Sequence, residues 1–170
     1  MDITLKKYNY RFAEQVLNSK LSIKDEYENI ISNPTDDLSI LSRPKFNQIL
    51  KDKFSEKGWE VEPNVFDDSD SANAKMDFLK DRVGIEVGFG HPSFIGIDLL
   101  KFQVSSYSEL NKIDVGVYVV TTAKFQKLMI EKYKQKWTGS LNYEKVVKYL
   151  PFFKSAIQVP VQVIGIDSSA

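Results

Sequence analysis

The chain has 170 residues, of which 42% are hydrophobic and 12% aromatic, an amount that suits one domain with a buried core. It contains no cysteine and one histidine, which excludes disulfides, thiolate metal sites and cysteine nucleophiles, so any metal is expected to have oxygen ligands. The sequence has no run of the ~20 apolar residues that a membrane span needs, and its N-terminus lacks the apolar core of a signal peptide. We therefore expect a cytoplasmic protein.

The first 43 residues are expected to form helices and a loop that precede the main fold. Apolar side chains recur at helical spacing over residues 4–17. A second helix is expected from an N-cap at Ser22 through Ile31. The polar stretch 32–44 is typical of a loop.

Residues 44–167 are expected to alternate helices with strands. Pro44 opens a predicted helix that ends near Gly58. A short strand is expected over residues 58–63, and the acidic, polar stretch 64–75 predicts a loop.

The hydrophobic period changes after residue 77. Residues 83–89 alternate apolar side chains with Gly and Glu, which predicts a strand, and residues 112–120 and 158–166 have the apolar density of further strands. Strands that alternate with helices favour a single α/β domain with a mixed sheet covered on both sides. Three helix N-caps are expected in this part of the chain: Asp98, Thr122 and Asn142.

The stretch MDFLKDRVGIEVGFG, residues 76–90, predicts a hairpin with two opposed carboxylates. If the turn centres on Asp81 and Arg82, Asp77 lies directly opposite Glu86 on one face of the hairpin. A register shift of one residue would turn one carboxylate to the other face. Like charges this close repel each other, so a cation between them would stabilise the pair.

Two neighbouring carboxylates are typical of half a site for a hard divalent cation. Mg²⁺ takes one or two carboxylates from a protein and leaves its other positions to water and substrate phosphate. The carbonyl oxygen of Val87 is a third candidate ligand. Gly84 and Gly88 leave the strand bare beside Glu86, which gives a DNA backbone room to approach. The alternative is an ordinary hairpin with both acids in solvent and a bulge at the glycines.

Several stretches in a fixed order resemble a known enzyme family. DFLKDRVGIEVGFG, SFIGIDLLKF and KIDVGV resemble the core of type II restriction endonucleases of the BglII and BstYI kind, relatives of BamHI among the PD-(D/E)XK nucleases. FNQILKDKFSEKGW, TGSLNY and VPVQVIGI extend the resemblance over about residues 45–167. The resemblance implies a restriction-endonuclease-like core in a homodimer that hydrolyses both strands of a short DNA palindrome with Mg²⁺, with a GATC core as one candidate.

The resemblance also assigns metal-binding roles. Asp77 matches the metal-bridging aspartate of the family, Glu86 its second metal-ligating acid, and Val87 the position whose carbonyl binds the ion. In some relatives the helix that corresponds to the one opened by Pro44 lends a further acid. Here Gln48 or Asn47 stands at that place, and either amide would at most contact water around the ion.

Position 88 departs from the family pattern. The wider superfamily has Glu-x-Lys, and closer members have Glu or Gln as the third residue, whereas this chain has Gly88. Residue 88 shares a strand face with Glu86, so its side chain would lie beside the metal and the attacking water. His91 and Lys101 are candidate substitutes, although a histidine before proline is commonly a turn residue and a helical lysine commonly points to water. A natural or engineered loss of function at Gly88 is the other interpretation.

The C-terminal lysines gain a role from the same resemblance. Net charge is zero, but residues 121–170 carry 8 basic and 3 acidic side chains, a pattern typical either of solvated helices or of a phosphate-facing surface. TGSLNY matches a segment that approaches DNA in the relatives. Ser140 and Asn142 are therefore candidates for base contacts, with helix capping as their alternative role. The candidates for phosphate contacts are Lys132, Lys134 and Lys136.

Two other functions are compatible with these features. One is a sequence-specific DNA-binding dimer disabled at Gly88, and the other is a structure-specific nuclease that acts on junctions or in repair. A palindromic target would require a two-fold dimer, with either the first two helices or the helix from Asp98 at its interface. The sequence leaves open the target bases, the cleavage position and whether a cognate DNA methyltransferase accompanies the protein.

Overall fold

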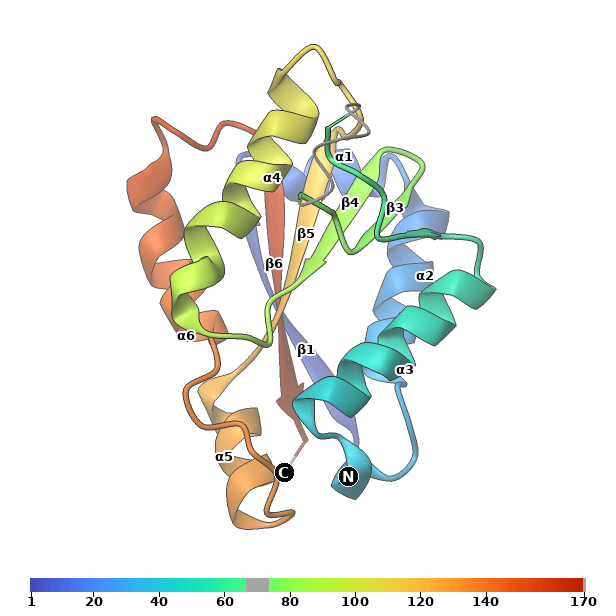
Figure 1. Ribbon diagram of the computed structural model, residues 1–170, viewed down its shortest axis with the longest axis vertical. Helices are drawn as coiled ribbons and strands as arrows, with labels where there is room; N and C mark the ends of the chain where they lie inside the picture. Colours follow the sequence, from blue (N-terminus) through green and yellow to red (C-terminus); the bar gives the residue numbers. More distant parts are fainter. Residues whose placement is uncertain (67–73, 170) are drawn as a thin grey trace.

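The computed structural model describes residues 1–66 and 74–169. Within these residues a six-stranded mixed sheet has the order β1-β6-β5-β4-β3-β2 (Figure 1). β4, β5 and β6 are parallel, and the outer strands pair antiparallel with their neighbours, which confirms the predicted α/β domain. The strands are β1 (Ile3–Tyr10), β2 (Glu60–Val61), β3 (Phe78–Lys80), β4 (Val83–Val87), β5 (Val115–Thr121) and β6 (Val161–Ser168).

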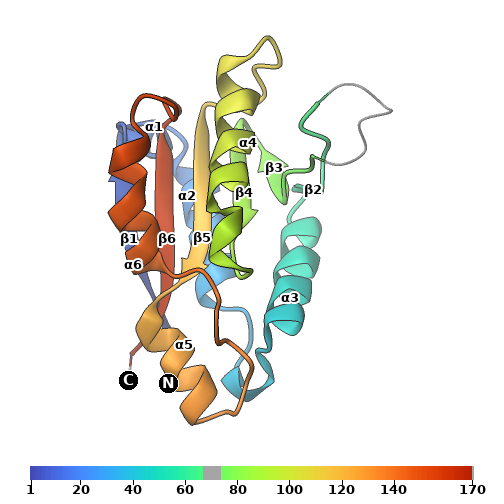
Figure 2. The ribbon, with the colours of Figure 1, turned by 60° about the vertical axis from the view of Figure 1, so that its left-hand side comes forward.

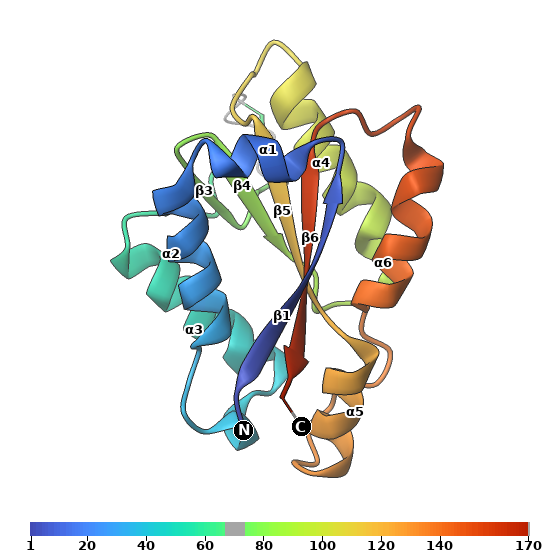
Figure 3. The same ribbon diagram turned by 180° about the vertical axis from the view of Figure 1, so that it is seen from behind.

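Helices cover both faces of the sheet. α4 and α6 lie in front of it in Figure 2, and the view from behind in Figure 3 brings α1 and α2 forward. No helix in the described ranges is long and apolar enough to cross a membrane. The helices are α1 (Ala13–Asn18), α2 (Leu21–Ser32), α3 (Arg43–Glu56), α4 (Ile95–Tyr107), α5 (Ala123–Glu131) and α6 (Tyr143–Tyr149), with short 3-10 turns at Leu38–Ile40, Pro92–Phe94 and Leu150–Phe153.

The sheet separates two hydrophobic clusters because successive residues of a strand point to opposite faces. Val117 and Val119 of β5 pack with α1, α2 and α3, whereas Tyr118 and Val120 pack with α4 and α6. Glu86 of β4 projects to the α4 side of the sheet, so α4 is the helix that can contact it.

The helix expected over residues 4–17 is wrong in its first half. β1 occupies Ile3–Tyr10 and pairs antiparallel with β6 along its whole length. Leu5 packs into the first cluster and Tyr8 into the second, so both faces of this strand are covered by apolar material. The need to pair the open edge of β6 overrides the helical spacing. The N-terminal segment therefore contributes to the central sheet itself.

Two predicted N-caps are confirmed and two are wrong. The side chains of Thr122 and Asn142 accept hydrogen bonds from backbone N–H groups at the starts of α5 and α6. α2 begins one residue before Ser22, and α4 begins three residues before Asp98, which lies inside its first turn. Much of the loop expected over residues 64–75 falls outside the described ranges.

Candidate functional site

The β3–β4 hairpin has the predicted register. Phe78 pairs with Ile85, and the turn residues Asp81 and Arg82 have φ of 47° and 65°. Both lie in the left-handed region, as a two-residue turn of the type that fits strand twist requires, even though neither residue is glycine. The hairpin thus brings the stretch before β3 against the end of β4.

The two predicted carboxylates come together at this point. Asp77 accepts a hydrogen bond of 2.7 Å from the backbone N–H of Val87, directly after Glu86. The Glu86 side chain is buried, with 3% of the residue exposed. Among residues 1–66 and 74–169 its Oε1 has no hydrogen-bond partner, so one oxygen of a buried carboxylate is available to a ligand.

α4 completes the site with a lysine and a third acid. Lys101 Nζ lies 2.9 Å from Glu86 Oε2 and 3.4 Å from Asp98 Oδ1, and its side chain is only 16% exposed. Tyr118 of β5 donates a 2.7 Å hydrogen bond to Asp98 Oδ2. The solvent-facing alternative for Lys101 is therefore wrong, because the lysine turns inward and bridges two carboxylates.

The cluster contains three acidic side chains and one lysine. Burial, followed by the charge of Asp77, raises the pKa of Glu86 to about 9. Burial also raises the pKa of Asp77 and that of Asp98. Burial alone would lower the pKa of Lys101, but the three surrounding carboxylates outweigh it and the pKa is raised. A further cation would therefore be favoured beside these acids.

The donor atoms fit a magnesium ion. No three histidine, cysteine or acidic side chains within the described ranges form a metal cage, but Mg²⁺ requires only one or two carboxylates. Asp77, Glu86 and Val87 line one pocket of 220 Å³. Within the described ranges the Oε1 atom of Glu86 has no hydrogen-bond partner, so it is an available metal ligand. These three residues are the ones that would hold the ion.

The face beside Glu86 is not bare, contrary to the expectation from its glycines. A Cβ atom at Gly88 would lie 2.7 Å from Tyr118 Cε2, and one at Gly84 would lie 2.3 Å from Met76 Sδ. The glycines make room for these two side chains of the protein. The space of the missing side chain at position 88 is thus occupied by Tyr118.

The other accessory candidates lie near the cluster but have local partners. His91 lines the 220 Å³ pocket, and its Nδ1 accepts a hydrogen bond from the backbone N–H of Ser93, as a turn residue does. Gln48 lines a second pocket of 320 Å³ that Asp77 also borders, and its amide donates to Asp52 Oδ1 at 2.8 Å.

The segment 132–142 connects α5 to α6 and contacts the chain after β4, where the backbone N–H of Leu141 donates to the carbonyl of Gly90. Ser140 is buried, and its Oγ accepts a 3.2 Å hydrogen bond from Arg43 Nη1. Asn142 accepts from the backbone N–H of Lys145, which is the capping role. The lysines at 132, 134 and 136 are exposed.

Sequence reasoning missed Asp98 as a site residue, and it missed Tyr118 and Arg43 altogether. Asp98 and Lys101 are three residues apart, so their common helix face was a usable signal. Tyr118 carries no such signal, because only the pairing of β4 with β5 places it over Gly88. Arg43 meets Ser140 across 97 residues of sequence.

Comparisons with known proteins identify the family and the fold. The family model described as restriction endonuclease BglII/BglIII matches residues 5–166, which includes β1 as well as the stretch from residue 45. A search of curated protein sequences found no match.

Two solved structures share the fold. The crystal structure of restriction endonuclease BglII complexed with a DNA 16-mer matches with a TM-score of 0.75 and 20% identity, over 98% of this chain and 77% of that one. The crystal structure of free BglII matches with a TM-score of 0.66 and 17% identity, over 98% and 80% of the two chains.

Proposed function

Because the chain belongs to the restriction endonuclease BglII/BglIII family, we propose that it is a type II enzyme that hydrolyses DNA phosphodiesters at a short palindromic site with Mg²⁺. The observation that carries this proposal is the buried cluster of Asp77, Glu86 and Lys101, which combines an unpartnered carboxylate oxygen with an inward-facing ammonium group. A site with a GATC core is the candidate target.

Asp77, Glu86 and the carbonyl of Val87 would hold the ion. Bound there, Mg²⁺ supplies a Lewis acid for a phosphate oxygen and favours ionisation of water. In the reaction a water oxygen forms a bond to phosphorus while one ester P–O bond breaks, the water gives up a proton to solvent, and the departing alkoxide takes one up from solvent, which leaves a phosphate monoester and an alcohol. The carboxylates of Glu86 and Asp77 would orient the attacking water through hydrogen bonds. Because the site is buried, these hydrogen bonds are stronger than they would be in solvent.

Lys101 takes the role of the side chain that position 88 lacks. Its ammonium lies 2.9 Å from Glu86, where it can donate to the attacking water or offset charge on the phosphate. Asp98 and Tyr118 hold the lysine in place from the opposite side. This arrangement supports an active enzyme in spite of Gly88.

A homodimer is part of the proposal, with α4 at its interface. One side of this helix exposes the large apolar residues Ile97 (52% exposed), Leu100 (45%) and Tyr107 (60%), and the exposed Phe94 (56%) directly precedes the helix. A row of this kind without charges suits an isologous contact with the same row of a second copy. The inner face of the same helix carries Lys101, so the interface would support the site directly.

Incubation of the protein with plasmid DNA and Mg²⁺ or Mn²⁺ tests the proposal. We expect discrete fragments, no cutting in EDTA, and no cutting by an Asp77→Asn variant, which keeps the size of the side chain but lacks its charge. Retarded migration without cleavage would instead indicate a DNA-binding protein. Cutting confined to branched DNA would indicate a structure-specific nuclease.

A further inference from the structure

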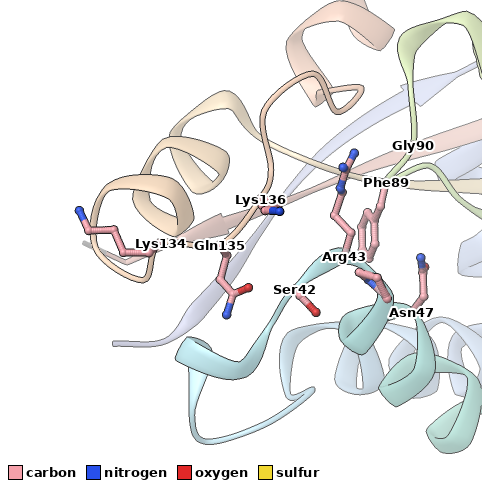
Figure 4. A pocket seen from close by; sticks show the side chains of 9 residues that line it. Ser42, Arg43, Asn47, Phe89, Gly90, Lys134, Gln135 and Lys136 are labelled. Atoms are coloured by element: carbon pink, nitrogen blue, oxygen red, sulfur yellow. The ribbon is translucent and has the colours of Figure 1, made fainter.

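A pocket of 680 Å³ beside the catalytic cluster has a positively charged lining (Figure 4). Arg43 and Asn47 of α3, Gly90 after β4 and Lys136 after α5 are among its lining residues, and none of the described residues that line it is acidic. Gly90 also lines the pocket of Glu86. The positive pocket therefore adjoins the cluster proposed to cleave DNA.

Arg43 is the most constrained cation of this pocket. It is partly buried, and the only hydrogen bond that its side chain forms within the described ranges is the one to Ser140. A guanidinium group has five N–H donors, so most of its donors are still available. No carboxylate in the described part of the chain forms an ion pair with it, although a partly buried charge is stabilised by a counter-ion. Its available N–H donors and its unpaired charge within the described ranges therefore favour binding of an anion by Arg43.

The two sides of the pocket are linked before any ligand arrives. Trp137 Nε1 donates a 2.9 Å hydrogen bond to the carbonyl of Leu41, and Gln135 donates to the carbonyl of Ser39. Together with the bond from Arg43 to Ser140, these contacts fix the segment 132–142 against the start of α3. Figure 4 shows Arg43 between Lys136 and Phe89, whereas Lys134 extends away from the other side chains.

We propose that Arg43 and Lys136 bind one backbone phosphate of the DNA and so position the strand for cleavage at the Glu86 cluster. This inference rests on the proposed function, because it concerns the same substrate. A planar guanidinium binds phosphate through two parallel hydrogen bonds, and a lysine adds a point charge. Ser140 acts through Arg43, since its hydroxyl oxygen orients the guanidinium. Arg43 is a positioning residue that contacts phosphate and does not read bases.

Equilibrium binding of labelled 16-base-pair duplexes tests this assignment. The full-length protein and its Arg43→Gln, Arg43→Lys and Ser140→Ala variants are titrated in EDTA at several salt concentrations, with one duplex that contains GATC and one that lacks it. Lys127→Gln is the matched control, because it removes one positive charge from an exposed position on α5 outside the pocket. Thermal unfolding verifies that each variant is folded.

We expect Arg43→Gln to weaken binding of both duplexes by about tenfold and to reduce the slope of log affinity against log salt by about one. Arg43→Lys should keep the slope but lose part of the affinity, and Ser140→Ala should lose a smaller part. Affinity and slope equal to those of Lys127→Gln would overturn the inference, as would a loss confined to one duplex, which would indicate a base contact. If the parent protein binds neither duplex, the proposed function fails as well.

Discussion

At the scale of single residues, the site depends on a lysine that comes from a helix. The strand position two residues after Glu86 is glycine, and the space of its side chain is filled by Tyr118. Lys101 reaches the same carboxylate from α4 and is held there by Asp98. The positive charge of the site is thus supplied from outside the strand motif.

Replacing Lys101 by Met is expected to reduce the single-turnover cleavage rate at least a hundredfold. Methionine replaces the apolar stem of the side chain, one heavy atom shorter, and removes the charge beside Glu86. DNA affinity should change less than threefold, and Lys101→Arg should recover part of the rate. Lys127→Met is the control on an exposed helix surface. A cleavage rate within a few-fold of the parent would show that Lys101 has no part in the chemistry.

Asp114 supplies a prediction on pH. A hydrogen bond from Arg82, together with the charges of Arg82 and Lys20, lowers the pKa of Asp114. A lowered pKa in the folded protein stabilises the fold above the pKa of the unfolded chain, and this contribution is lost as pH falls through the folded value. The carboxylate side chain is 40% exposed, so solvent limits the effect to less than about 1 kcal/mol.

Asp114→Asn should therefore lower the free energy of unfolding at pH 7, and the difference from the parent should shrink towards pH 3. Urea denaturation at the two pH values measures it. A difference that is equal at both pH values would mean that the Arg82 contact contributes through packing alone.

At the scale of elements, the close approach of β4 and β5 determines what position 88 can hold. The parallel pairing sets Glu86 beside Tyr118, and the tyrosine ring then lies over Gly88. Any larger residue at 88 has to displace a side chain that is itself bonded to Asp98. Replacing Gly88 by Glu or Gln, the residues that the resemblance implies here, is therefore expected to disturb the contact of Tyr118 with Asp98.

Gly88→Ala is expected to destabilise the protein by about 1–3 kcal/mol because its Cβ would overlap the Tyr118 ring. The cost should be smaller in a Tyr118→Ala background, and urea denaturation of the four proteins of this double-mutant cycle measures the coupling. By the same reasoning Gly88→Gln should fail to raise cleavage. An additive cycle would contradict the packing argument.

At the scale of the whole molecule, the arrangement of α4 joins the proposed interface to the proposed site. Its outer row of apolar residues is exposed, and its inner face contacts Glu86 through Lys101. The lysine-rich segment after α5 is attached to the start of α3 by Trp137, whose indole is buried among Phe46, Phe89 and Phe125. One aromatic cluster thus supports both the end of β4 and the proposed DNA-binding pocket.

Ile97→Asp tests the dimer. A charge in the middle of the apolar row should convert the protein to a monomer and slow coordinated cutting of both strands, while the protein stays folded. Light scattering after size-exclusion chromatography measures the mass. Leu21→Asp is the comparison variant, since Leu21 is 57% exposed at the start of α2, the other candidate interface. A parent protein that is monomeric at micromolar concentration, or an unchanged mass for Ile97→Asp, would place the interface elsewhere or rule it out.

The sequence by itself determined the features that are local. Alternation of apolar residues, turn position and cap chemistry act over a few residues, so they predicted the β3–β4 register, the positions of the strands β4, β5 and β6 and the caps at Thr122 and Asn142. The adjacency of Asp77 and Glu86 followed from the same hairpin, because opposed positions in a short hairpin are set by its turn.

Only the tertiary structure decided the features that depend on distant segments. The pairing of β1 with β6 turned an expected helix into a strand, since an open sheet edge gains more from a partner than the segment loses in helical propensity. Lys101 turned inward because α4 packs on the face that carries Glu86, and Arg43 met Ser140 through a shared aromatic core. Residue spacing does not encode such contacts, because their energy comes from side chains that only folding brings together.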